Sequence, residues 1–197
     1  MSKKNTSTSN KSYTLNNNLI DFKLTRWSDM PDIGLYMDQV LVLMDKYIGA
    51  LFIAKDKDSF LTPSMINNYV KLGVMNPPVS KKYSREHLAY LTIICLMKQA
   101  LSISSIKILL NSELNQATIQ EVYEKFCNYY EEYLTAITKN ENIHLGTNTS
   151  KDNILKLGIV SNICRLVSDI EIKLLEESKS NLPTTNNKKK QETVKKK

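Results

Sequence analysis

Residues that break helices are scarce in this chain, and this scarcity narrows the range of possible folds. The 197 residues include only five Gly and five Pro. An all-β sandwich needs a turn about every ten residues, which this composition does not supply. The chain is also 42% hydrophobic, which is enough for a packed core. The composition therefore predicts an all-α fold.

Apolar residues recur at helical spacing in six segments. The first helix is expected to begin near residues 29–32, where acids and a Pro suit a first turn, and to run to Leu51. The other five helices are expected at about 62–72, 84–100, 102–110, 119–137 and 152–177. The last two segments can pair as a helical hairpin, and their broad apolar faces favour contact with a second chain.

The segment from Thr62 to Ser84 carries the clearest boundary signals. Thr62-Pro63 supplies a hydroxyl N-cap followed by Pro at the first helical position, and Gly73 supplies the stop. The sequence Asn76-Pro77-Pro78 forces extended chain, so residues 79–83 are expected to form a brief strand pair or a loop. Ser84 then caps the next helix.

Positive charge is unevenly distributed along the chain. The formal net charge is +7, yet residues 1–18 and 178–197 are Lys-rich, and residues 19–177 sum to −2. Within that body, residues 60–110 carry six Lys and Arg against Glu86 alone. A basic segment between two acidic ones is typical of a nucleic-acid-binding unit, although six cations in fifty residues also fit an ordinary solvated surface. The two tails are expected to be disordered.

The sequence offers no pattern for a metal centre or an enzyme. Cys95, Cys127 and Cys164 lie more than thirty residues apart, and the two His supply no ligand pair. No nucleophile is paired with a base at a familiar spacing, and no Gly-rich phosphate loop is present. We therefore expect a cytoplasmic, non-enzymatic protein without cofactor, metal or membrane span. His87 is expected at the surface beside a helix cap.

The stretch from Met65 to Pro78 resembles the recognition helix and following turn of MerR-type regulators. The shared features are Tyr69 four residues before Gly73, two apolar residues after that Gly, and a Pro pair. Residues 81–84 resemble the end of the MerR wing, and residues 101–110 resemble the next turn and helix. From Trp27 to Leu110, the chain is similar to a bacterial family with a domain of unknown function and a MerR-like winged helix.

This resemblance implies contacts with double-stranded DNA. The side chains of Asn67 and Asn68 can pair bidentately with adenine, and the MerR family usually carries Arg-Tyr at these two positions. The resemblance places Tyr69 at a phosphate and Tyr83 in the wing. Phosphate contacts are expected from the remaining hydroxyl and basic side chains, namely Thr62, Ser64, Lys71, Lys81, Lys82 and Arg85.

These observations predict a DNA-binding transcriptional regulator that acts as a homodimer. Residues 19–112 are expected to form the MerR-like winged helix-turn-helix, and residues 113–177 the C-terminal helical hairpin that dimerises it. The alternative is a winged helix that binds protein instead of DNA. A third hypothesis, a small-molecule sensor, places a pocket among the tyrosines of residues 119–139, although aromatics at helical spacing are more typical of a core. The sequence points to no particular small-molecule effector.

Overall fold

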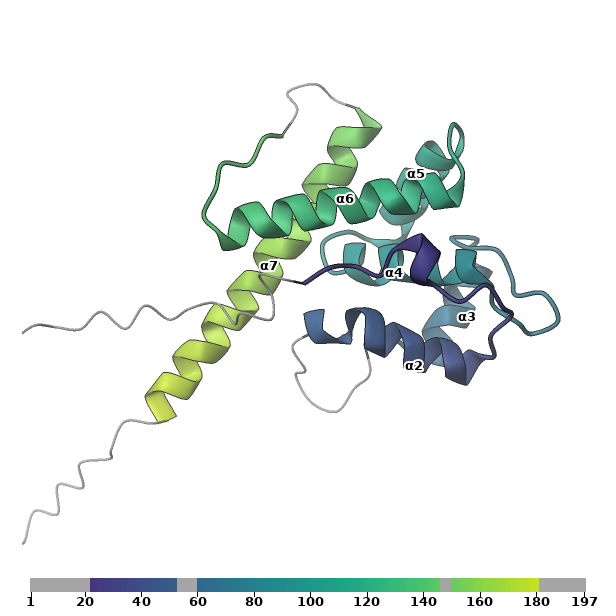
Figure 1. The fold of residues 1–197 in the computed structure, drawn as a ribbon, viewed down its shortest axis with the longest axis horizontal. Helices are drawn as coiled ribbons and strands as arrows, with labels where there is room; N and C mark the ends of the chain where they lie inside the picture. Colours follow the sequence, from purple (N-terminus) through teal and green to yellow (C-terminus); the bar gives the residue numbers. More distant parts are fainter. Residues whose placement is uncertain (1–21, 53–59, 146–149, 181–197) are drawn as a thin grey trace, which may run out of the picture.

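A computed structural model describes residues 22–52, 60–145 and 150–180, which are all-helical (Figure 1). The predicted tail at 1–18 lies outside the described residues, as do residues 181–197 of the predicted tail at 178–197, whereas residues 178–180 belong to the last helix. Two short 3-10 helices, η1 (Trp27–Asp29) and η2 (Gly49–Leu51), accompany the α-helices. The α-helices are α2 (Met37–Ile48), α3 (Pro63–Lys71), α4 (Arg85–Met97), α5 (Ile103–Leu114), α6 (Ile119–Thr138) and α7 (Lys151–Ser180). The all-α prediction is confirmed for this part of the chain.

The start of the first long helix was predicted wrongly. Helix α2 begins at Met37 rather than near residues 29–32. The preceding residues are extended, because Leu35 and Tyr83 exchange two backbone hydrogen bonds of 2.8 Å as an isolated antiparallel bridge. A second bridge joins Val79 to Lys82, and the described residues contain no longer strand.

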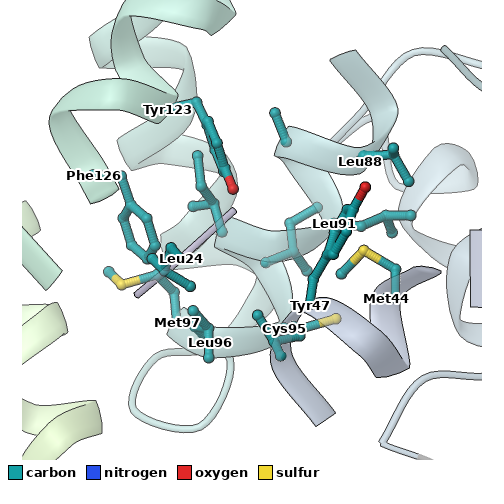
Figure 2. Packing of buried hydrophobic residues seen from close by; sticks show 14 of the residues in the cluster. Leu24, Met44, Tyr47, Leu88, Leu91, Cys95, Leu96, Met97, Tyr123 and Phe126 are labelled. Atoms are coloured by element: carbon teal, nitrogen blue, oxygen red, sulfur yellow. The ribbon is translucent and has the colours of Figure 1, made fainter. Parts of the chain in front are cut away.

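Helix α4 is the centre of the core. Ten of its thirteen residues are buried, on every side of the helix. Leu88, Leu91 and Met97 meet side chains from α2 and α6, as Figure 2 shows for the cluster around Met44, Tyr47, Tyr123 and Phe126. Burial of a large apolar side chain stabilises the fold by roughly 1.5–3 kcal/mol, so α4 anchors the elements that surround it.

Helices α6 and α7 pack against each other and on α4 and α5, but the predicted hairpin is not formed, because the start of α7 lies beside the first half of α6 and the two helices cross (Figure 1). The tyrosines of α6 belong to the core rather than to a ligand pocket. Tyr130 donates a hydrogen bond of 3.0 Å to the buried Asn162 of α7, and Tyr123 donates one of 2.6 Å to the carbonyl of Thr25. Burial raises the pKa of both phenols above the ordinary value, so they stay protonated and act as donors.

A charged network fixes the start of α7 against α5 and α6. Lys125 lies 2.5 Å from the buried Glu113 carboxylate and 3.4 Å from Asp152. Asp152 also accepts hydrogen bonds of about 3 Å from Tyr129 and pairs with Lys156 at 3.0 Å. The ammonium of Lys125 therefore bridges two carboxylates from different helices.

Asp152→Asn is expected to make stability less dependent on pH. Burial acts to raise the pKa of Asp152, but the hydrogen bonds and charges of Lys156, Tyr129 and Lys125 outweigh it and lower that pKa. The contribution of the carboxylate is full above its unfolded-state pKa of about 4 and is lost as pH falls through the lower folded-state pKa. Because the side chain is 38% exposed, we expect a loss of only about 0.5–1 kcal/mol at pH 7.

Urea unfolding followed by circular dichroism at pH 7 and pH 3 measures the difference in free energy of unfolding between the wild-type protein and Asp152→Asn. The difference should shrink at pH 3, whereas Glu132→Gln, at an exposed position on α6, should change little at either pH. An equal deficit of Asp152→Asn at both pH values would contradict the role given to this carboxylate.

Candidate nucleic-acid interface

Helix α3 has firmly fixed ends, as its sequence predicted. The Thr62 hydroxyl accepts a hydrogen bond of 3.3 Å from the Met65 amide, and Pro63 occupies the first helical position. Gly73 ends the helix with a φ of 64°, a left-handed conformation that glycine adopts without strain. An N-cap hydroxyl, a proline and a glycine therefore limit α3 to nine residues.

One face of α3 is polar and exposed. Ser64, Asn67, Asn68 and Lys71 are spaced three or four residues apart, so they line one side of the helix, and all four are exposed. Ile66 and Tyr69 lie on the opposite side and are buried. Helix α3 contains no acidic residue. The structure thus brings together four of the predicted site residues on a face that carries no negative side chain.

The two predicted tyrosine contacts lie in the core instead. Tyr69 is 2% exposed and Tyr83 is 4% exposed, so neither ring reaches the surface of the polar face. Burial raises the pKa of Tyr69 to about 12, and its hydroxyl accepts a hydrogen bond of 3.4 Å from Lys98. Tyr83 packs edge-on against His87, with ring centroids 5.3 Å apart. This burial argues against the predicted direct contacts of Tyr69 and Tyr83 with DNA.

His87 was also expected at the surface, but it is buried. Its Nδ1 accepts a hydrogen bond of 2.9 Å from the Ser84 amide, so the imidazole closes a capping box at the start of α4. A capping box usually has Glu or Gln at this position, so a His there does not stand out in the sequence.

A tight hairpin presents two of the predicted lysines. Val79 and Lys82 exchange backbone hydrogen bonds of 3.1 and 2.9 Å around a two-residue turn. Ser80 and Lys81 both have positive φ, 49° and 62°, as a type I′ turn requires. Lys81 and Lys82 are exposed, and the Lys82 ammonium lies 5.7 Å from the ring centroid of Tyr36.

Arg85 lies apart from these exposed cations. Its side chain is 19% exposed, with Nη2 3.7 Å from an Asp32 carboxylate oxygen. Its guanidinium lies 5.7 Å from the Trp27 ring centroid, within cation–π range. Arg85 thus ties the N-terminal segment to the start of α4 and faces an acid.

Two lysines that sequence motifs did not single out contact the end of α3. The Lys107 ammonium, on α5, donates a hydrogen bond of 2.7 Å to the Leu72 carbonyl just beyond α3. Lys98, the residue after α4, lies over the Tyr69 ring at 5.6 Å in addition to its hydrogen bond. Both belong to the basic segment at 60–110, which was the only sequence signal for them.

A shallow apolar groove of about 350 Å³ lies on α2, and none of its lining residues belongs to α3. It is lined by Leu35, Asp38, Gln39, Val42 and Leu43. Val42, on the rim of this groove, is 70% exposed.

No candidate metal site is present among the described residues. They contain no group of three or more His, Cys, Asp or Glu arranged to hold a metal ion. A search of the same residues also finds no helix with the length and hydrophobicity to cross a membrane.

These features define an all-helical protein with a polar, acid-free helix face beside a basic hairpin. Residues 25–133 match the family described as a domain of unknown function, DUF1836. This match covers more than half of the chain, and the protein belongs to that family. The matched region runs from the segment before η1 through most of α6. No curated protein and no solved structure matches the chain.

The hairpin turn carries backbone strain that a substitution can release. A non-glycine residue in the left-handed region costs roughly 1–2 kcal/mol, so Lys81→Gly is expected to stabilise the protein by about 0.5–1 kcal/mol after the added entropy of the unfolded chain. Thermal unfolding gives the change. Lys82→Gly is the matched control, because Lys82 has no positive φ and its replacement should lower the melting temperature. A decrease with Lys81→Gly would contradict the strained turn.

Proposed function

We propose that this protein is a transcriptional regulator that binds duplex DNA through a MerR-like winged helix-turn-helix. The observation that carries the proposal is the exposed, acid-free face of α3. In this arrangement α3 enters the major groove, and Asn67 and Asn68 contact adenine through their amides. Ser64 and the Thr62 end of α3 lie at the phosphate backbone. Under this proposal the chain is a binding protein and not an enzyme.

The hairpin at 79–82 takes the place of the wing. It consists of a single bridge rather than a strand pair of normal length, which makes it a minimal wing. Lys81 and Lys82 project from it, and each can neutralise one phosphate. The contacts of Arg85 with Asp32 and Trp27 make that residue a support for the fold in this proposal, not a phosphate contact.

The proposal includes a homodimer formed through α7. Ile154, Leu157 and Ile172 are exposed on this helix. Ile172 lies eighteen residues after Ile154, which is five full turns, so both point the same way. A second copy on this face would cover these side chains and would set two α3 helices against a palindromic site.

Replacing the side chains on the outer face of α7 tests the dimer. Leu157→Glu combined with Ile172→Glu is expected to convert a dimer to a monomer, because charged groups would be buried at the interface. Light scattering after size-exclusion chromatography measures the mass. Lys173→Glu, exposed on another side of α7, is the control and should leave the mass unchanged. A wild-type protein that is monomeric at high micromolar concentration would contradict this arrangement.

Anisotropy titrations with fluorescent duplexes test the DNA-binding activity. The full chain is used with its six lysines at 188–190 and 195–197 replaced by Gln, so that the tail does not supply the affinity. The probes are a random duplex and the DNA upstream of its own gene. Lys81→Ala with Lys82→Ala is expected to weaken binding to both and to lower the salt slope by about two. Asn67→Ala with Asn68→Ala is expected to reduce the preference for the specific site by about 10-fold or more.

The control for the lysine pair is Lys46→Ala with Lys139→Ala, which removes the same charge at exposed positions on α2 and after α6. It should leave the slope almost unchanged. Failure of the parent protein to bind either duplex at low salt would overturn the DNA-binding proposal.

A protein-interaction module is the second candidate function. The apolar groove on α2 favours it, because a partner's apolar side chain could occupy the groove and cover the exposed Val42. In that case the parent protein would not bind DNA, and substitutions at Val42 rather than at Lys81 would reduce binding to a partner.

A further inference from the structure

Two lysines from separate parts of the chain contact the last turn of α3 and the residue after it. Lys98 follows α4 and reaches the Tyr69 hydroxyl at 3.4 Å. Lys107 comes from α5 and reaches the Leu72 carbonyl at 2.7 Å. Lys71, the final residue of α3, is exposed between these two contact points in the sequence. Lys98 and Lys107 therefore contact the C-terminal turn of α3 and the residue after it, where Lys71 is exposed.

These three positive charges lack a nearby carboxylate. None of the ion pairs formed among the described residues involves Lys71, Lys98 or Lys107. Helix α5 has one acid, Glu113, which is buried at its far end and paired with Lys125. No ion pair among the described residues therefore offsets the charge of the cluster.

The contacts of Lys98 and Lys107 orient their ammonium groups but do not use all of their N–H donors. An ammonium has three N–H donors. Lys98 uses one for the Tyr69 hydroxyl, and Lys107 uses one for the Leu72 carbonyl. Lys98 is exposed and Lys107 is half-buried, so their remaining donors are available to solvent or to a ligand. A side chain already held in place loses less conformational entropy when it binds than a free surface lysine does.

We propose that Lys98 and Lys107, with Lys71, form a second phosphate-binding cluster that grips the DNA backbone at the C-terminal end of α3. This inference rests on the proposed function and adds a contact that the hairpin lysines do not supply. The cluster and the hairpin would then hold the duplex at two separate places while α3 lies in the groove. A purely structural role, in which the lysines only cap the negative end of the helix dipole, is the competing account.

The salt dependence of DNA binding distinguishes the two accounts. Lys98→Gln with Lys107→Gln is compared with wild type and with Lys46→Gln and Lys139→Gln, all in the full chain and on the random duplex. Each phosphate contact contributes about 0.9 to the slope of log K against log salt, so the Lys98 and Lys107 variant should lose about two. The control pair should lose almost nothing. Lys98→Arg with Lys107→Arg should keep the wild-type slope, because it retains both charges.

Each outcome has a defined meaning. A lower slope for the Gln pair, with the slope kept by the Arg pair, supports the cluster. An unchanged slope in a Gln variant that melts at a lower temperature would assign the lysines to helix capping and overturn the inference. If the Gln pair does not fold, the single variants Lys98→Gln and Lys107→Gln are each expected to lose about one unit of slope, and no loss in either would count against the cluster. A wild-type chain that does not bind the duplex would overturn the proposed function itself.

Discussion

The structure depends on the complete burial of α4. An α-helix that is apolar on every side must be covered by other elements, and here α2, α5, α6 and α7 provide the cover (Figure 1). The position of the proposed interface follows from this burial, because the hairpin leads directly into α4 through Tyr83 and Ser84. Tyr83 is buried against His87 in the first turn of α4, so the base of the hairpin is part of the core even though its tip is exposed.

The same core joins the two regions that were predicted from the sequence, residues 19–112 and 113–177. One hydrophobic cluster extends from Leu24 to Leu166, and it includes side chains of both the α2–α5 region and the α6–α7 pair. Polar contacts then fix α7 against α5 and α6, since Lys125 bridges Glu113 and Asp152, and Tyr130 donates a hydrogen bond to Asn162. Helix α5, which α7 contacts in this way, also carries Lys107, whose ammonium contacts the residue after α3.

Local signals in the sequence predicted local structure well. Thr62-Pro63, Gly73 and Ser84 mark element boundaries because capping and backbone conformation depend on neighbouring residues. The start of α2 was missed because Leu35 pairs with Tyr83, a contact between segments almost fifty residues apart. The burial of Tyr69 and the position of Lys107 also depend on distant packing. The exposed face of α3 was predictable from helical spacing, whereas the lysines around its end required the structure.

The strained hairpin turn links the fold to the proposed function. A type I′ turn favours Asn-Gly, yet this turn carries Ser80 and Lys81 in left-handed conformations at a cost of roughly 1–2 kcal/mol for each non-glycine residue. Nothing in the packing requires a lysine there, because the Lys81 side chain is exposed. Strain of this kind is tolerated where the side chain is useful in the place to which the turn directs it. A cation fixed at the tip of a hairpin, next to an acid-free helix, is useful if a polyanion lies across both. Under the DNA-binding proposal, the cost of the turn and the composition of α3 would have the same physical explanation, which a protein partner at this face would not supply.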